Sequence, residues 1–480
     1  MTNIKNKIVV NSLSIYIAKA ASLFISFFVF ISIANYLGDV DFGKLSIAIT
    51  YVAAFDIIAN FGVNQIIIRE LAAHRYKFEK VAASGITLKV IVTLSAFLLS
   101  LLSLKFINYP RETTIAIIII AFNLLISSKL SSTRTIFDTV FQANLQMFYP
   151  MLFMVIDNVL FAVAFYLLKA YSNPTILQIA LIYSITNLPG FLLIIIRFFR
   201  TVKPDFHGIA KLNKIIFIEC IPVAFFLLFS MMTTKIDILM LSRMTSDADV
   251  GVYSAAVRLV YPLMFFSTSF TLSLFPLFSK YYGHDETRFL RVFYTGTKIV
   301  FLIAVILSIP LALNAELLVK KLYVAEFHGA VAPFRILIIT LGFSFFNFYF
   351  IDLLIAVKKQ KVLSYFLGVS LFFNILLNFL LIPKLSYVGS SYARLFSAIL
   401  LFILFNIALI KIFKINKIFE SHLLGFFLVF FLGQIILSKL NLILYFLLST
   451  LFLLILILLF KIISTSELKL ILNQLKRSTD

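Results

Sequence analysis

DVDFGKLSIA, residues 39–48, and DADVGVYSAA, residues 247–256, share the pattern D-x-D-x-G-x-x-S-x-A at a separation of 208 residues. Each stretch forms a short polar break between two long apolar segments. Asp and Gly are ordinary loop residues, so a single match of this kind could arise by chance. Five identities at a fixed spacing, in equivalent breaks, favour an internal duplication of the chain.

The composition is that of an integral membrane protein. Of the 480 residues, 62% are hydrophobic and 13% are charged, whereas soluble domains are about half apolar and about a quarter charged. A bilayer core about 30 Å thick requires about 20 apolar residues per helix, and such segments account for nearly the whole chain. The apolar run after Met1–Lys7 is longer than the core of a signal peptide and contains Lys19, so we interpret it as the first spanning helix.

Hydropathy and loop signals predict fourteen transmembrane helices joined by short connections. The predicted spans are 12–36, 44–68, 82–104, 112–128, 146–168, 175–197, 215–241, 251–279, 293–317, 332–356, 362–382, 386–410, 422–438 and 443–463. We therefore expect an all-α integral membrane fold without a domain outside the membrane.

The distribution of basic residues orients these helices. With the N-terminus in the cytoplasm, the inward loops carry 26 Lys and Arg residues and the outward loops carry 9, out of 42 in the chain. Such an excess in short loops marks the cytoplasmic side, so both termini are expected there. The formal net charge of +21 is then a topology signal and an attraction for anionic lipid, which argues against a nucleic-acid partner.

Six predicted helices separate the two copies of the repeated turn. Because an even number of spans returns the chain to the same side of the membrane, and the N-terminus is expected in the cytoplasm, both turns are expected to face outward. We therefore predict two pseudo-symmetric six-helix lobes, 1–208 and 209–417, followed by two further helices and a cytoplasmic tail in 418–480. Parallel repeats of this kind are related by an axis along the membrane normal, and their substrate path lies between them.

Several segments resemble bacterial polysaccharide flippases of the O-antigen type. KIDILML at 235–241, the second copy of the repeat through Leu259, and FPLFSK at 275–280 resemble helices 7 and 8 of that family. ANYLG at 34–38 with the first copy is similar to the family's first hairpin, and Arg69-Glu70 also fits. These motifs mark the multidrug/oligosaccharidyl-lipid/polysaccharide exporter superfamily better than they mark a substrate, and helices 9 to 14 match only in hydropathy.

The resemblance implies two lobes of the multidrug and toxin extrusion type around a central cavity, with alternating access. It implies translocation of undecaprenyl-pyrophosphate-linked oligosaccharide repeat units from the cytoplasmic to the outer leaflet of the bacterial inner membrane. The expected partners are this substrate, membrane lipids, and a polysaccharide polymerase with chain-length proteins. No catalytic residue, cofactor or metal is expected, because the single Cys220 and five scattered His residues form no ligand cluster.

Three other functions stay open. A multidrug antiporter on the same scaffold typically carries an acid in helix 1, where this chain has Lys19 and no acid before Asp39. A lipid II flippase is a close variant of the leading hypothesis. A membrane-embedded glycan polymerase or ligase is expected to expose a large outward loop, and the outward loops here are short.

Charged residues inside membrane helices are rare and usually functional. Three basic residues lie within about two turns of a helix end, so we expect them to reach the interface by snorkelling. They are Lys89, Lys298 and Arg335.

Four deeper basic residues are the candidates for binding the pyrophosphate, with Lys235 and Arg258 first and Lys19 and Arg394 next. An ammonium or guanidinium group in a low-dielectric groove forms charge-assisted hydrogen bonds with phosphate oxygens. Lys235 and Arg258 flank the second copy of the repeat. The alternative is an internal ion pair, such as Arg258 with Asp237.

Asp56 and Asp157 lie near the middle of the second and fifth predicted helices, where a carboxylate must be paired or protonated. One hypothesis is a proton or sodium site that couples transport to an ion gradient. The alternative is a hydrogen-bonded helix contact with Asn60, Asn64 or Asn158.

The remaining acids of interest are expected to have structural roles. Asp39, Asp41 and Asp249 are interpreted as turn and N-cap residues at the positive ends of helices. Asp352 and Glu219 lie nearer the cytoplasmic helix ends.

Overall fold

The computed structural model describes residues 2–438 and 440–460. All regular secondary structure in these residues is helical, which confirms the all-α prediction. The end of the predicted span 443–463 and the predicted tail after it lie outside the described residues.

The chain forms two compact units, Met1–Gly251 and Val252–Ser478. The boundary falls inside helix α11 (Asp247–Val260), so α10 (Ala210–Met244) lies in the first unit. The lobes predicted from the duplication are 1–208 and 209–417, which assigns α10 to the second lobe. These lobe boundaries stay a prediction.

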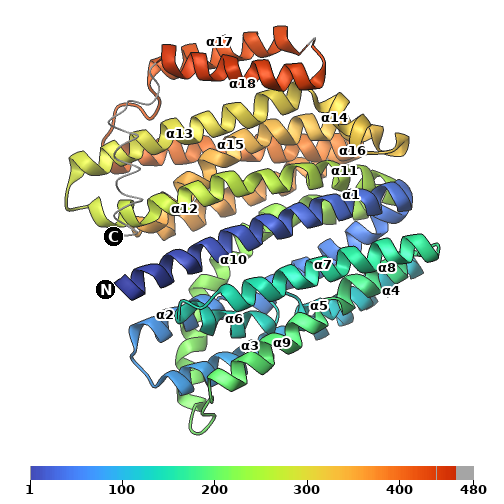
Figure 1. Ribbon diagram of the computed structural model, residues 1–480, viewed down its shortest axis with the longest axis vertical. Coiled ribbons are helices and arrows are strands. Elements are labelled where there is room, and N and C mark those ends of the chain that lie inside the picture. Colours follow the sequence, from blue (N-terminus) through green and yellow to red (C-terminus); the bar gives the residue numbers. More distant parts are fainter. Residues whose placement is uncertain (1, 439, 461–480) are drawn as a thin grey trace. The chain divides into compact units, whose positions relative to one another are not determined.

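The first unit is built around its long N-terminal helix, which packs against α3, α4, α7 and α10 (Figure 1). Apart from α10, its elements are α1 (Thr2–Asn60), α2 (Val63–Ala73), α3 (Phe78–Ser103), η1 (Leu104–Phe106), α4 (Arg111–Ala121), α5 (Asn123–Ile126), α6 (Arg134–Ala143), α7 (Phe148–Tyr171), α8 (Ile176–Ile185) and α9 (Leu188–Thr201). One apolar cluster of this unit joins α2, α3, α6, α9 and α10.

The second unit is a layered bundle in which α15 packs against α12, α13 and α16. Its elements after α11 are η2 (Tyr261–Leu263), α12 (Met264–Tyr281), α13 (Glu286–Leu313), α14 (Ala315–Leu322), η3 (Ala325–Ala330), α15 (Val331–Ala356), α16 (Gln360–Phe413), α17 (Ser421–Leu437) and α18 (Leu442–Leu459). The last two helices form a pair, and α17 packs on α13 (Figure 1).

Two long helices each contain a break that separates two predicted spans. In α1 the break is at Gly38, with φ 74° and ψ 177°. Glycine adopts this left-handed conformation without a Cβ clash, so the chain can turn directly before the first copy of the repeat. In α16 the break is at Ser386, with φ 47°. The break at Gly38 falls in the predicted connection between spans 12–36 and 44–68, and the break at Ser386 falls on the first residue of the predicted span 386–410.

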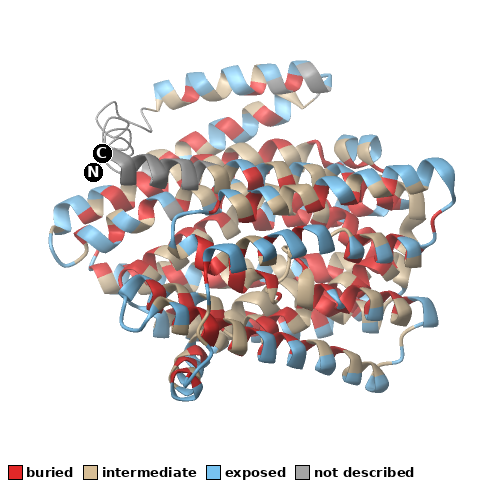
Figure 2. Cartoon of the chain, turned by 60° about the horizontal axis from the view of Figure 1, so that its bottom comes forward, coloured by how far each residue is buried: buried red, intermediate tan, exposed pale blue. Residues whose placement is uncertain are grey.

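The helices have the surface of a membrane protein. Among the described residues, nine helices are long and apolar enough to cross a membrane, and two of these contain the breaks at Gly38 and Ser386. With the shorter apolar helices, the count is consistent with fourteen spans. Many helices carry buried residues on one face and exposed ones on another (Figure 2). Exposed side chains such as Ile436 (71%) and Leu458 (76%) are apolar, as expected for a face solvated by lipid.

The expected N-caps are partly wrong. Helix α11 begins at Asp247, and the hydroxyl of Ser246 accepts from the main-chain N–H of Asp249 at 3.2 Å. Ser246 is therefore the cap, and Asp249 lies in the first helical turn. Asp41 pairs with Lys44 at 2.9 Å instead of capping.

Candidate functional site

Asp56 lies in a group of polar and charged residues in the first unit. Its side chain is buried, and its carboxylate accepts from the main-chain N–H of Ser131 at 2.5 Å and from the Ser131 hydroxyl at 3.4 Å. Lys89 and Lys235 lie close enough to act electrostatically on this carboxylate. The expected asparagine partners are wrong: the loop between α5 and α6 holds Asp56 instead.

Lys89 does not snorkel. Its side chain is fully buried, and Nζ donates to the carbonyl oxygen of Ala59 at 2.9 Å. The helix breaks just beyond this carbonyl, at Phe61 (φ 40°) and Gly62 (φ 76°). A break leaves carbonyl groups without their helical partners, and Lys89 supplies one of them with a donor. The expectation failed because distance from the helix end does not reveal a break in the neighbouring helix.

We expect Lys89→Met to lower the free energy of unfolding by about 1–3 kcal/mol, because the buried Ala59 carbonyl would lose its donor. Removal of the positive charge near Asp56 acts in the same direction. Lys211→Met on the exposed start of α10 is the matched control, with an expected change of about 0.5 kcal/mol or less. Thermal unfolding in detergent compares the two, and equal melting temperatures would contradict the role given to Lys89.

Asp157 has a cationic partner that the sequence did not indicate. Arg134 and Asp157 have fully buried side chains and form an ion pair through Nη1 and Oδ2. Asp157 also accepts from the main-chain N–H of Gly190 at 3.1 Å and from the Ser128 hydroxyl at 3.5 Å. A side chain at Gly190 would overlap this carboxylate. Asn158 instead accepts from Ser26 at 3.3 Å, so it is not the partner.

The basic-residue count places Arg134 among the cations of an inward loop, and this assignment is wrong. Arg134 begins α6, a helix that packs against α2 and α9. Ser131 precedes this helix, and both residues follow the apolar segment 112–128. Ile136, Phe137, Val140 and Phe141 recur at helical spacing and are all buried, so this periodicity was the signal that the chain forms a helix packed into the protein here.

The predicted phosphate-binding residues have different environments. Lys19 is exposed on α1, and Lys235 is partly buried on α10 beside the fully buried Asp237. Arg258 is partly buried on α11, within electrostatic reach of Tyr323. Lys235 and Arg258 belong to different units.

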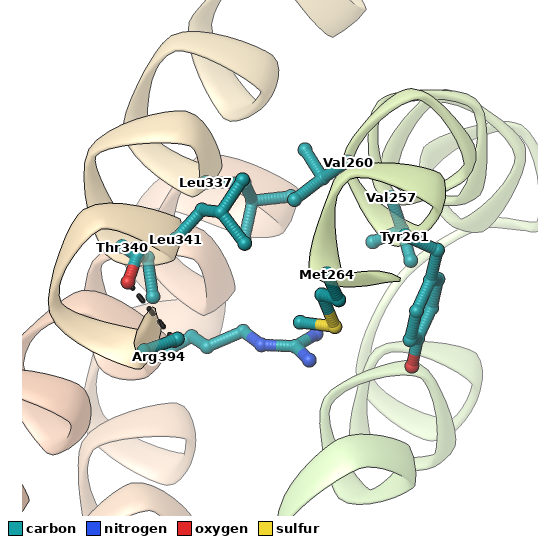
Figure 3. A pocket seen from close by; sticks show the side chains of 9 residues that line it. Val257, Val260, Tyr261, Met264, Leu337, Thr340, Leu341 and Arg394 are labelled. Carbon is teal, nitrogen blue, oxygen red and sulfur yellow. Dashed lines mark hydrogen bonds between the residues drawn. The ribbon is translucent and has the colours of Figure 1, made fainter. Parts of the chain in front are cut away.

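Arg394 lines a small pocket in the second unit. Its side chain extends from α16 toward Met264, with Leu337 and Thr340 of α15 on one side and Tyr261 on the other (Figure 3). The pocket volume is about 20 Å³, which is enough for about one water molecule. In this conformation the pocket is too small for a pyrophosphate group.

A larger cavity of about 670 Å³ lies between α13, α15, α16 and α17 in the second unit. Its lining is apolar except for Arg335 and Ser308. Arg335 lies near the start of α15 with its side chain exposed, and Nε donates to the carbonyl oxygen of Ala312 at 3.2 Å. Its position near a helix end is consistent with the predicted snorkelling.

The other charged residues considered above make local contacts. Lys298 pairs with Glu420 at 3.2 Å, and the hydroxyl of Thr271 donates to Asp352 at 2.5 Å. Glu219 pairs with Arg69, which links α10 to α2. These contacts agree with structural roles for Asp352 and Glu219.

The structure thus places ionisable groups inside a bundle of membrane helices, several of which are broken. Intramembrane charges and interrupted helices are features of secondary transporters. The protein is a multi-pass integral membrane protein with these features.

The chain belongs to the polysaccharide biosynthesis protein family, whose model matches residues 8–282. The MatE family model matches residues 222–380. Together these matches place the protein among the polysaccharide flippases of the multidrug/oligosaccharidyl-lipid/polysaccharide exporter superfamily, as the resemblance implied. No curated protein matches the sequence.

Solved structures share the fold at low sequence identity. A structure of the lipid II flippase MurJ in an inward closed conformation has a TM-score of 0.72 and 16% identity, over 94% of this chain and 98% of that one. A structure of the multidrug transporter DinF-BH has a TM-score of 0.62 and 16% identity, over 87% and 98%. A superfamily transporter from Pyrococcus furiosus has a TM-score of 0.58 and 14% identity, over 86% and 97%.

Proposed function

We propose that the protein is a flippase for undecaprenyl-pyrophosphate-linked oligosaccharide repeat units of the O-antigen or capsule type. It would move them from the cytoplasmic to the outer leaflet of the bacterial inner membrane by alternating access, with both termini in the cytoplasm. A polysaccharide polymerase and chain-length proteins would use the product. Membership of the polysaccharide biosynthesis protein family over residues 8–282 is the observation that carries this proposal.

The head group of such a substrate needs cationic partners within the membrane. A pyrophosphate cannot enter hydrocarbon without compensation of its charge. Lys235 and Arg258 lie within long apolar helices and are only partly buried, so they supply suitable donors. Lys19 is exposed on the first helix and supplies another, with Arg394 as a donor in a conformation with a wider pocket.

The polyprenyl tail needs an apolar surface. The cavity of about 670 Å³ in the second unit lies within the range of about 300–1,000 Å³ for small-molecule sites. Phe301, Phe343, Phe346 and Phe402 contribute to its lining. We assign it a segment of the tail, with Arg335 at the margin where a polar group could be reached.

Coupling to an ion gradient belongs to the same proposal. Asp56 is the stronger candidate, because its carboxylate interacts with a hydroxyl, an amide and nearby lysines that could rearrange together. Asp157 is bound directly by Arg134, so an ion would have to compete with a guanidinium.

Deletion of the gene, followed by analysis of lipid-linked glycans, tests this function. We expect a polyprenyl-pyrophosphate oligosaccharide to accumulate on the cytoplasmic leaflet while the corresponding surface glycan is lost. A plasmid copy of the gene should restore both. Accumulation of the lipid-linked peptidoglycan precursor would instead identify a lipid II flippase, and unchanged glycans with increased drug sensitivity would identify a multidrug antiporter.

A further inference from the structure

Six exposed basic residues lie at one end of the first unit, on the loop between α2 and α3 and on the segment that joins α9 to α10 (Figure 1). The two segments, 74–80 and 200–214, contain only two acidic residues, Glu79 and Asp205. This end of the unit therefore carries a strong excess of positive charge. We call the six cations the basic rim: Arg75, Lys77, Arg200, Lys203, Lys211 and Lys214.

The two segments of the rim are held against each other. The main-chain N–H of Asp205 donates to the carbonyl oxygen of Glu79 at 3.2 Å, and the Asp205 carboxylate lies 3.9 Å from Nζ of Lys80. Asp205 also accepts from the main-chain N–H of His207 at 3.0 Å. These contacts make one surface of the two segments and engage the Asp205 carboxylate within it.

The start of α10 continues the rim into an apolar face. After Lys211 and Lys214, residues Ile218, Ile221 and Phe225 follow at helical spacing and lie on the same face of the helix. All three apolar side chains are exposed, Ile218 at 54% and Phe225 at 60%. An exposed apolar face that begins at two lysines is suited to an amphipathic ligand, with its charged part at the lysines and its apolar part along the helix.

The end of α9 has the same arrangement in the opposite chain direction. Leu193 and Ile196 are exposed, and Arg200 follows on the same helix face. The helix ends at Thr201, and Lys203 comes two residues later. The other faces of α9 and α10 pack into the apolar cluster that they share with α2, α3 and α6, so these exposed faces are directed away from that cluster.

We propose that the basic rim and these two helix faces bind an anionic phospholipid with two phosphates, of the cardiolipin type. The rim contacts the phosphates, because ammonium and guanidinium groups form charge-assisted hydrogen bonds with phosphate oxygens. The exposed faces of α9 and α10 contact the acyl chains. The basic-residue count predicts that this end faces the cytoplasm, and basic sites at that side of membrane helices bind such head groups.

Two features favour this ligand over a lipid with one phosphate or one tail. The rim extends over two segments of the chain, so a single phosphate could contact only part of it. Two apolar faces, one on each helix, suit a lipid with several acyl chains, whereas a polyprenyl lipid has a single tail. The bound lipid is thus distinct from the transported substrate, and its site does not depend on the proposed function.

Native mass spectrometry of the full-length protein in detergent, titrated with cardiolipin, tests the site. We expect one cardiolipin to bind about tenfold or more tightly than phosphatidylethanolamine, whose head group has no net charge. Lys203→Gln combined with Lys214→Gln should weaken cardiolipin binding by about 25-fold, because each basic residue near an anionic lipid surface contributes about fivefold. Both lysines are exposed, so the melting temperature of this variant should equal that of the parent.

Two further variants make the result specific. Lys359→Gln with Lys361→Gln removes the same charge from the loop between α15 and α16, which the basic-residue count also predicts to face the cytoplasm. This control should change cardiolipin binding by less than about twofold, because it leaves the rim intact. Ile218→Ala shortens the apolar face without a change of charge, and it should weaken binding by about threefold.

Equal cardiolipin binding by the rim variant and the parent would overturn the proposal. An equal loss in the control pair would also overturn it, because the attraction would then be general to basic loops. Tighter rim-dependent binding of undecaprenyl pyrophosphate than of cardiolipin would assign the rim to a single-tailed lipid and exclude the phospholipid. The gene deletion tests the proposed function separately, since no transport is measured in this titration.

Discussion

Replacement of Arg134 by methionine is expected to lower the free energy of unfolding by about 3–5 kcal/mol, which is the usual cost of breaking a buried ion pair from one side. Both side chains of the Arg134–Asp157 pair are fully buried. After the replacement Asp157 would keep hydrogen bonds from the Gly190 amide and the more distant Ser128 hydroxyl, and the weaker electrostatic attraction of Lys129. Thermal unfolding of the purified protein in detergent measures the effect.

A double-variant cycle separates the ion pair from simple loss of packing. Arg134→Met combined with Asp157→Asn should be less destabilised than the sum of the two single changes, because neither charge of the pair is then left buried without the other. Asp138 also lies within electrostatic reach of Arg134, and it loses this cation in the single and the double variant alike. Arg200→Met on the exposed end of α9 is the matched control. Additive effects, or an Arg134 variant as stable as that control, would show that the pair contributes nothing to stability.

The same cycle bears on ion coupling. If Asp157 acts mainly as the partner of Arg134, Asp157→Asn should lower stability more than transport. If it carries the coupling ion, transport should fall while the melting temperature of the variant stays close to that of the parent. Asp157 as a coupling residue stays a prediction until this comparison is made.

Lys235→Ala and Arg258→Ala are each expected to lower flux of a lipid-linked pyrophosphate oligosaccharide in proteoliposomes by about tenfold or more. A hydrogen bond to a charged group contributes about 1.5–3 kcal/mol, and about 1.4 kcal/mol is tenfold in an equilibrium constant. Lys235→Arg should retain most of the flux because it keeps the positive charge. Lys211→Ala, at the exposed start of the same helix, should leave flux unchanged.

An internal ion pair is the alternative role for Lys235, since it lies within electrostatic reach of Asp56. In that case Lys235→Ala should lower the melting temperature, and combination with Asp56→Asn should partly restore it. If Lys235 binds the substrate instead, Lys235→Ala should lower flux and leave the melting temperature unchanged. Full flux in both the Lys235 and the Arg258 variants would remove them from the mechanism.

Much of the fold could be predicted because membrane helices are specified locally. About 20 consecutive apolar residues define a span without reference to the rest of the chain. The break at Gly38 falls between two predicted spans, and the break at Ser386 falls at the first residue of one, since turns in a membrane protein require residues that leave the helix. Short interruptions within a span were harder to predict. The break at Phe61 and Gly62 lies inside an apolar stretch, and its freed carbonyl is satisfied by a distant lysine.

The candidate site was predicted less completely. The sequence identified Asp56 and Asp157 as costly charges, because a carboxylate within an apolar helix is visible from hydropathy alone. Their partners were not visible. Ser131 and Arg134 lie in and just after a loop, 75 and 23 residues away from the acids they contact, and no local periodicity encodes such contacts.

Hydropathy and internal repetition can be read directly from the amino-acid sequence. They were therefore enough to predict that this protein crosses the membrane many times and carries two copies of one turn. Three contacts could be seen only in the packed helices: the glycines of those turns meet, Arg134 is buried against Asp157, and Lys89 completes a broken helix. Each joins residues that are far apart in the chain. Their energy depends on distance and burial, which exist only after the helices have packed.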